Sequence, residues 1–154
     1  MRGTPGLIAT AVAAVLLIGT TFADWYVVVI DNPMFGALMR SGGGNVGRLT
    51  TSPWTGHAPL AGLLVALATA AVALAGYSTA KKVNRAALAG GAVVAALATV
   101  SILVAQLAGS RVQEFAGFTV QVSFAPAFFV AAACAAALLV AAAANLWEAT
   151  QTRD

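Results

Sequence analysis

The side chains that could do chemistry in this chain are few. Its 154 residues include five acidic residues, one histidine and one cysteine. An enzyme site needs a nucleophile with a base, or a pair of carboxylates. Asp24, Asp31, Glu114 and His57 come nearest to such a set, and they are far apart in the sequence. A hydrolase using Asp24 with His57 is conceivable, but we expect no enzyme and no catalytic residue.

Metal and cofactor sites also lack suitable ligands. Cys134 is the only cysteine, so neither a disulfide nor a thiolate cage can form within the chain. The single His57 falls short of the two imidazoles that many metal and haem sites use. Gly42 and Gly47 are spaced as in a phosphate-binding loop, but Arg-Leu follows where Lys-Ser or Lys-Thr is required. We expect no cofactor and no metal.

The composition is that of a membrane protein. Hydrophobic residues make up 60% of the chain and charged residues only 8%, whereas a soluble domain carries roughly 25% charged residues. The net charge of +3 does not come from a basic run with interleaved aromatics, so we expect no nucleic-acid partner. The alanine content, with six Arg against two Lys, is typical of a GC-rich bacterial genome.

Four apolar segments, at about 7–30, 59–77, 86–107 and 125–146, organise the sequence. Each is near the ~20 residues that an α-helix needs to span a bilayer. We predict a single domain over residues 1–154, an all-α membrane protein with four transmembrane helices. The outer loops cover about 31–57 and 110–124. No cleavage signal follows the first segment, which predicts a retained helix rather than a signal peptide.

Positive charge predicts the orientation. Lys81, Lys82 and Arg85 form a tight cluster in the short loop between the second and third segments. Together with Arg2 and Arg153 they outnumber the three arginines on the opposite side. Cytoplasmic loops are enriched in Lys and Arg. We therefore predict a multi-pass protein of the bacterial cytoplasmic membrane, with both ends inside.

Aromatic residues lie near the ends of the apolar segments. Trp and Tyr are enriched at both membrane–water interfaces. We expect interface anchors at Trp25, Tyr26 and Trp54 on the outer side, and at Tyr77 and Trp147 on the inner side.

The outer loops carry a strand pattern. Apolar residues alternate with polar ones over 118–124, a period of two that indicates a strand with Phe118, Val120, Val122 and Phe124 on one covered face. The stretch 25–30 is β-branched and aromatic. It predicts a second strand, pairing with the first and with 48–51 in a small β-rich extracytoplasmic cap. The alternative is that 25–30 extends the first helix.

Small residues in the third and fourth segments predict close helix packing. Small side chains let helix backbones approach each other in lipid. This favours a compact bundle or docking onto the helices of a partner. The candidate positions are Gly90, Ala95, Ala98, Ala131, Ala135 and Ala142.

Several short motifs carry a family resemblance. The stretches 55–60 (TGHAPL) and 25–29 (WYVVV), with Arg85 and Trp147, resemble the actinobacterial tryptophan-operon-region conserved membrane proteins. The resemblance implies a four-helix membrane fold and supplies no activity or site residues. The tail after Trp147 has one Arg and departs from that family's basic end. The outline also looks claudin-like, without the loop cysteines or Gly-Leu-Trp motif of claudins.

These observations favour a non-catalytic function. Ionisable residues inside a membrane usually mark transport or proton relay, and the centres of these segments have none. We expect an accessory or assembly subunit of a larger membrane complex, such as a respiratory, lipid-transport or envelope assembly. Its partners would be other integral membrane subunits and lipids. The alternative is a small transporter or exporter of an apolar or aromatic solute.

Overall fold

Four helices form the body of the described part of the chain. The structure, a computed structural model, describes residues 4–31, 48–80, 84–109, 112–115 and 118–151. The charged residues Arg2, Lys81, Lys82 and Arg153, on which the predicted orientation depends, lie outside these ranges, as does the glycine-rich segment 42–47. The helices are α1 (Thr4–Thr20), α3 (Pro53–Ala80), α4 (Arg85–Ala108) and α5 (Pro126–Gln151).

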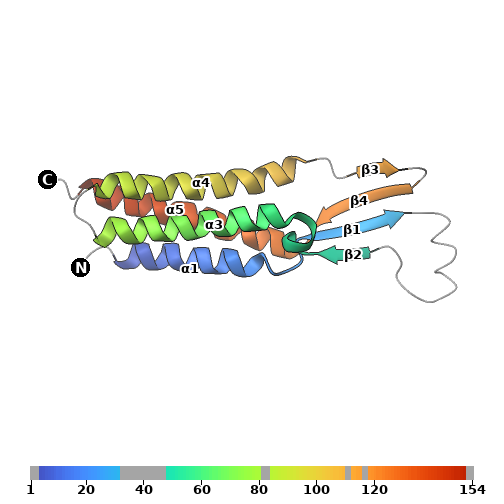
Figure 1. Cartoon of the computed structure of the whole chain (residues 1–154), viewed down its shortest axis with the longest axis horizontal. Helices are drawn as coiled ribbons and strands as arrows, with labels where there is room; N and C mark the ends of the chain where they lie inside the picture. Colours follow the sequence, from blue (N-terminus) through green and yellow to red (C-terminus); the bar gives the residue numbers. More distant parts are fainter. Residues whose placement is uncertain (1–3, 32–47, 81–83, 110–111, 116–117, 152–154) are drawn as a thin grey trace.

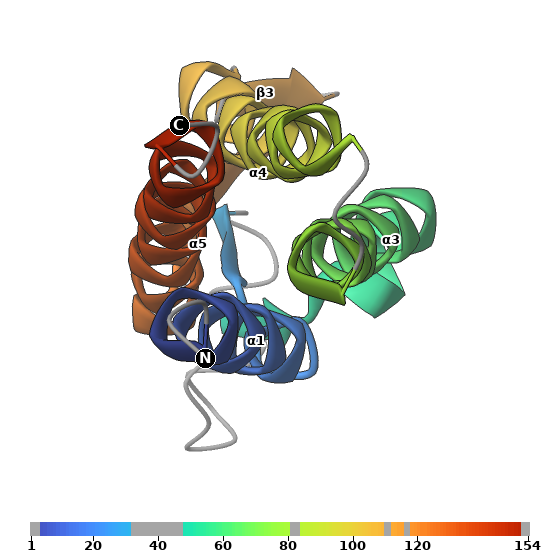
Figure 2. The ribbon, with the colours of Figure 1, turned by 90° about the vertical axis from the view of Figure 1, so that its left-hand side faces the viewer.

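The helices run side by side along the long axis of the molecule. The start of α1 and the end of α5 lie at one end, and a β-sheet lies at the other (Figure 1). Viewed end-on, the helices form a ring in the order α3, α1, α5, α4 (Figure 2). Neighbours around this ring pack against each other, whereas α3 and α5 touch little across it. The seams α1–α5 and α3–α4 are therefore on opposite sides of the bundle.

Length and composition separate the described helices into two groups. Three of them, α3, α4 and α5, are long and apolar enough to cross a membrane. The apolar helix α1 has 17 residues, which corresponds to about 25 Å. These features agree with the predicted helical membrane bundle.

Alanines form much of the bundle core. On α3 the residues Ala61, Ala68, Ala71 and Ala75 are fully buried, and they recur at helical spacing along one face. The α4 face that includes Ala92 and Ala96 is buried in the same cluster. Such small side chains allow close backbone approach in the absence of a hydrophobic driving force between helices. Larger buried side chains fill the rest of the core: Leu17, Leu64, Leu103, Phe128 and Leu138.

A four-stranded antiparallel sheet caps one end of the bundle. Its strands are β1 (Tyr26–Asp31), β2 (Arg48–Thr51), β3 (Val112–Phe115) and β4 (Phe118–Phe124), in the order β2-β1-β4-β3. Tyr26 lies opposite Thr51 on one side and Phe124 on the other. The predicted pairing of 25–30 with 48–51 and 118–124 is confirmed. Val120, Val122 and Phe124 are half-buried while Gln121 and Ser123 are exposed, as the alternation predicts; the side chain of Phe118 lies outside the described part.

The predicted extension of the first helix to residue 30 is wrong. The helix ends at Thr20, and a turn over 21–23 leads into β1. The polar residues Thr20, Thr21 and Asp24 interrupt the apolar run at this change. The β-branched residues Val27, Val28, Val29 and Ile30 instead pair in register with β4, and such side chains favour strands.

Helix α3 has a break near its start. His57 has non-helical backbone angles (φ −147°, ψ 61°) inside α3. Pro59, two residues further on, lies inside α3 and has no backbone N–H to donate to the carbonyl of Thr55. The first turn, from Pro53, is thus offset from the long helix, which starts close to the predicted residue 59.

The sheet repeats the order of the helix ring. Strand β1 follows α1, β2 precedes α3, β3 follows α4 and β4 precedes α5. The strand order β2-β1-β4-β3 therefore corresponds to the helix order α3-α1-α5-α4. The edge strands β2 and β3 do not pair with each other. The ring is thus closed among the helices but open in the sheet, above the seam between α3 and α4.

Candidate functional site

Most of the predicted partner-contact residues lie inside the chain's own bundle. Ala131, Ala135 and Ala142 on α5 and Ala95 on α4 are buried. Gly90 and Ala98 are half-buried. The four buried alanines bring the helices of this chain together, which corresponds to the compact-bundle alternative. Gly90 and Ala98 stay candidates for contact with a partner.

Trp25 is a core residue and does not fit the predicted role of an interface anchor. Its side chain is fully buried. The indole Nε1 donates a hydrogen bond to the carbonyl of Thr20 at 2.6 Å, and the ring meets Phe128 edge-on with 5.5 Å between centroids. The Trp25 carbonyl accepts a hydrogen bond from the amide of Ala125 at 2.8 Å. Trp25 therefore joins α1, the sheet and α5.

The other predicted anchors occupy different environments. Tyr26 is buried, and Trp54 is half-buried. The Trp54 indole donates to Thr21 Oγ1 at 3.1 Å and stacks on Phe22 at 5.8 Å between centroids. Tyr77 and Trp147 are exposed near the end of the bundle away from the sheet. The last two retain the exposure that an anchor needs.

A buried polar contact fixes α1 against α5. Asn145 Nδ2 donates to Thr10 Oγ1 at 3.0 Å, and the Thr10 hydroxyl donates to the carbonyl of Gly6 at 2.8 Å. Asn145 Oδ1 lies so near Gly6 that a Cβ at that position would clash with it. Glycine at position 6 thus allows the two helices to meet at this point.

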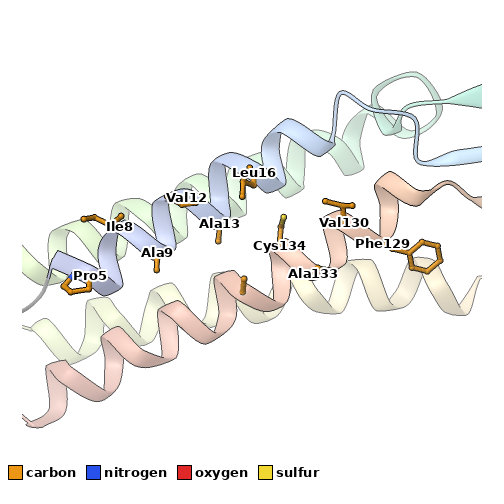
Figure 3. A pocket seen from close by; sticks show the side chains of 11 residues that line it. Pro5, Ile8, Ala9, Val12, Ala13, Leu16, Phe129, Val130, Ala133 and Cys134 are labelled. Carbon is orange, nitrogen blue, oxygen red and sulfur yellow. The ribbon is translucent and has the colours of Figure 1, made fainter.

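An apolar groove runs along the outside of the α1–α5 seam (Figure 3). It has a volume of about 990 Å³. The floor of the groove consists of four alanines, Ala9, Ala13, Ala133 and Ala137, and its rim consists of larger apolar side chains. Cys134, which is half-buried, also lines it. The remaining lining residues are Pro5, Ile8, Val12, Leu16, Phe129 and Val130.

A second cavity lies beneath the open side of the sheet. It has a volume of about 350 Å³ and lies between the start of α3, the end of α4 and one face of β1 and β4. Tyr26, His57 and Gln106 provide its polar groups together with Thr51. Gly56, Gly109, Val28, Val120, Val122 and Phe124 complete the lining that the structure describes. We call this space the junction cavity.

Sequence reasoning did not find either concave site. The groove consists of common apolar residues, and its shape depends on how α1 and α5 pack. Gln106 and Tyr26 are far apart in the sequence, and the fold brings the end of α4 to β1, so that Gln106 Oε1 lies 3.4 Å from the Tyr26 hydroxyl. A signal was present in Gln106, a polar residue near the end of an apolar helix. Among the described residues, no group of three or more His, Cys, Asp or Glu side chains could hold a metal ion.

Comparisons with known proteins do not assign this chain. Its sequence matches no family model, and no curated protein or solved structure matches it. The resemblance to the tryptophan-operon-region membrane proteins therefore stays a prediction.

Proposed function

We propose that this protein is a non-catalytic accessory or assembly subunit of a bacterial membrane complex, and that the α1–α5 groove receives an apolar transmembrane helix of a partner subunit. The four helices would cross the cytoplasmic membrane with the sheet outside. The location of the start of α1 and the end of α5 at the same end of the bundle supports an even number of crossings.

The groove is the observation that carries this proposal. From Pro5 to Leu16 its lining covers three turns of α1, or about 17 Å. Its floor of alanines and its rim of exposed Ile8, Val12 and Phe129 form a surface into which bulky side chains of another helix fit. Van der Waals packing of this kind drives helix association in lipid.

The alternative of a transporter receives less support from the helices. The buried polar side chains of the described residues already have hydrogen-bond partners: Thr10, Thr21, Ser78, Thr99 and Asn145. Four of these bonds end on a carbonyl of the same helix or turn, and the fifth joins Asn145 to Thr10. These groups do not form a polar path between the helices.

Groove-filling substitutions test the proposal. Ala9→Leu and Ala133→Leu each place a larger side chain on an exposed floor position, so they leave the bundle core intact. Ala73→Leu, at an exposed position on α3, is the matched control. After mild detergent extraction, we expect a stoichiometric partner chain to co-purify with the wild type and the control but not with the groove variants. A thiol-directed crosslinker at Cys134 should join the same partner.

Two results would contradict the proposal. One is a chain that purifies alone from native membranes. The other is a partner that is retained equally by Ala133→Leu and Ala73→Leu, which would place the contact elsewhere. Crosslinking of Cys134 to lipid alone would identify the groove as a lipid site.

A further inference from the structure

The junction cavity has aromatic walls. Tyr26 and Phe124 lie with 5.8 Å between ring centroids, and Tyr26 meets the His57 ring edge-on at 6.0 Å. All three residues line the cavity. Aromatic rings favour offset or edge contacts with other rings. The volume of about 350 Å³ lies at the lower end of the range for small-molecule pockets, so the cavity suits a ligand with one or two rings.

Hydrogen-bond donors lie at one point of this wall. The Tyr26 hydroxyl donates to Gln106 Oε1 at 3.4 Å, longer than the 2.5–3.0 Å usual for O–H···O bonds. Such a weak bond is easily exchanged for one to a ligand. The ordinary pKa of a tyrosine, 10.0, already keeps the phenol protonated at neutral pH, and burial raises the pKa of Tyr26 further. The Gln106 amide adds two N–H donors.

The charges of the cavity lining bear on the choice of ligand. None of its described lining residues is Asp, Glu, Lys or Arg. A charged ligand in a partly enclosed site needs a counter-charge, because the loss of its hydration is costly.

We infer that the junction cavity binds an uncharged planar ring bearing carbonyl oxygens, of the quinone class. The ring lies against Tyr26 and Phe124, and a carbonyl oxygen accepts hydrogen bonds from Gln106 and Tyr26. The junction cavity lies on the α3–α4 side of the helix bundle, opposite the groove. Binding of this ligand therefore does not depend on the proposed partner helix.

Binding of menadione to the purified full chain in detergent micelles tests this inference. Equilibrium dialysis, corrected with empty micelles, measures the saturable component. We expect Gln106→Leu to weaken binding roughly tenfold, as the loss of about one neutral hydrogen bond does. The matched control is Gln121→Leu on the other face of β4, where Gln121 is exposed. It should bind as the wild type does.

A second probe and a second variant separate the remaining outcomes. We expect 2-Methylnaphthalene, which has the rings without the carbonyls, to bind at least tenfold more weakly than menadione. Equal binding of the two probes would overturn the assignment of a carbonyl ligand. If circular dichroism shows that Gln106→Leu loses helical content, Gln106→Glu is the variant to use. Glutamate has the shape of glutamine without the amide donors, so this variant should also weaken menadione binding. The absence of saturable menadione binding to the wild type, or equal weakening by Gln121→Leu, would overturn the inference.

Discussion

Substitution of Gly6 by alanine should loosen the α1–α5 seam, although alanine is the better helix former. The new Cβ would meet Asn145 Oδ1 and lie 3.0 Å from Asn145 Cγ. Overpacking of this kind costs ~1–3 kcal/mol. Displacement of Asn145 would also weaken its hydrogen bond to Thr10, which in a membrane contributes about 0.6 kcal/mol. The gain from replacing glycine in a helix is at most ~1 kcal/mol. We expect a net destabilisation of about 1–3 kcal/mol.

Gly19 provides a matched control on the same helix. A Cβ added there meets nothing within 4 Å, so Gly19→Ala should be neutral or stabilising by up to ~1 kcal/mol. Unfolding by sodium dodecyl sulfate in mixed micelles, followed by far-ultraviolet circular dichroism, measures both variants. The double variant Gly6→Ala with Asn145→Ala removes the clashing oxygen and should recover part of the loss. Equal stabilities of the two glycine variants would refute the reasoning.

Three further results are expected. A reporter fused after Lys82 or Asp154 should be cytoplasmic and one inserted at Gly43 external; the reverse would overturn the proposed orientation. Ala135→Leu should destabilise the bundle by ~1–3 kcal/mol through overpacking, because Ala135 is only 1% exposed, while Ala136→Leu at an exposed position should change the unfolding midpoint little. Burial raises the pKa of Tyr26 above its ordinary value of 10.0, so the folded protein holds the phenol proton more tightly than the unfolded chain does. The contribution of this residue to stability is therefore complete below pH 10.0 and is lost as the pH rises through the folded pKa. Thermal melts of wild type and Tyr26→Phe should therefore diverge only above about pH 10.

The sequence predicted the kinds of elements better than their contacts. Apolar runs located the helices, and the period of two over 118–124 located β4, because these signals depend on local geometry. The end of α1 was misplaced because a second apolar stretch, 25–30, follows Thr20 after only four residues; the β-branched composition of 25–30 was the better guide. The faces of the helices could not be assigned, since a helix that is apolar all round has no distinct stripe. For this reason the sequence left open whether Ala131 and Ala142 pack within the chain or against a partner, and the groove residues were overlooked.

The pairing of β1 with β4 and of α1 with α5 joins the two ends of the described chain. The Trp25 carbonyl receives its hydrogen bond from Ala125, and Thr10 receives its bond from Asn145. A chain is made from its N-terminus, so α1 is complete before β4 and α5 exist. Its contacts with α5 can form only after most of the chain has been made. Such non-local contacts form late and slow the assembly of a fold. Until α5 is inserted, the side chains of Thr10 and Trp25 are not covered by that helix. The face of α1 that carries Thr10 is therefore covered only after α5 has been made.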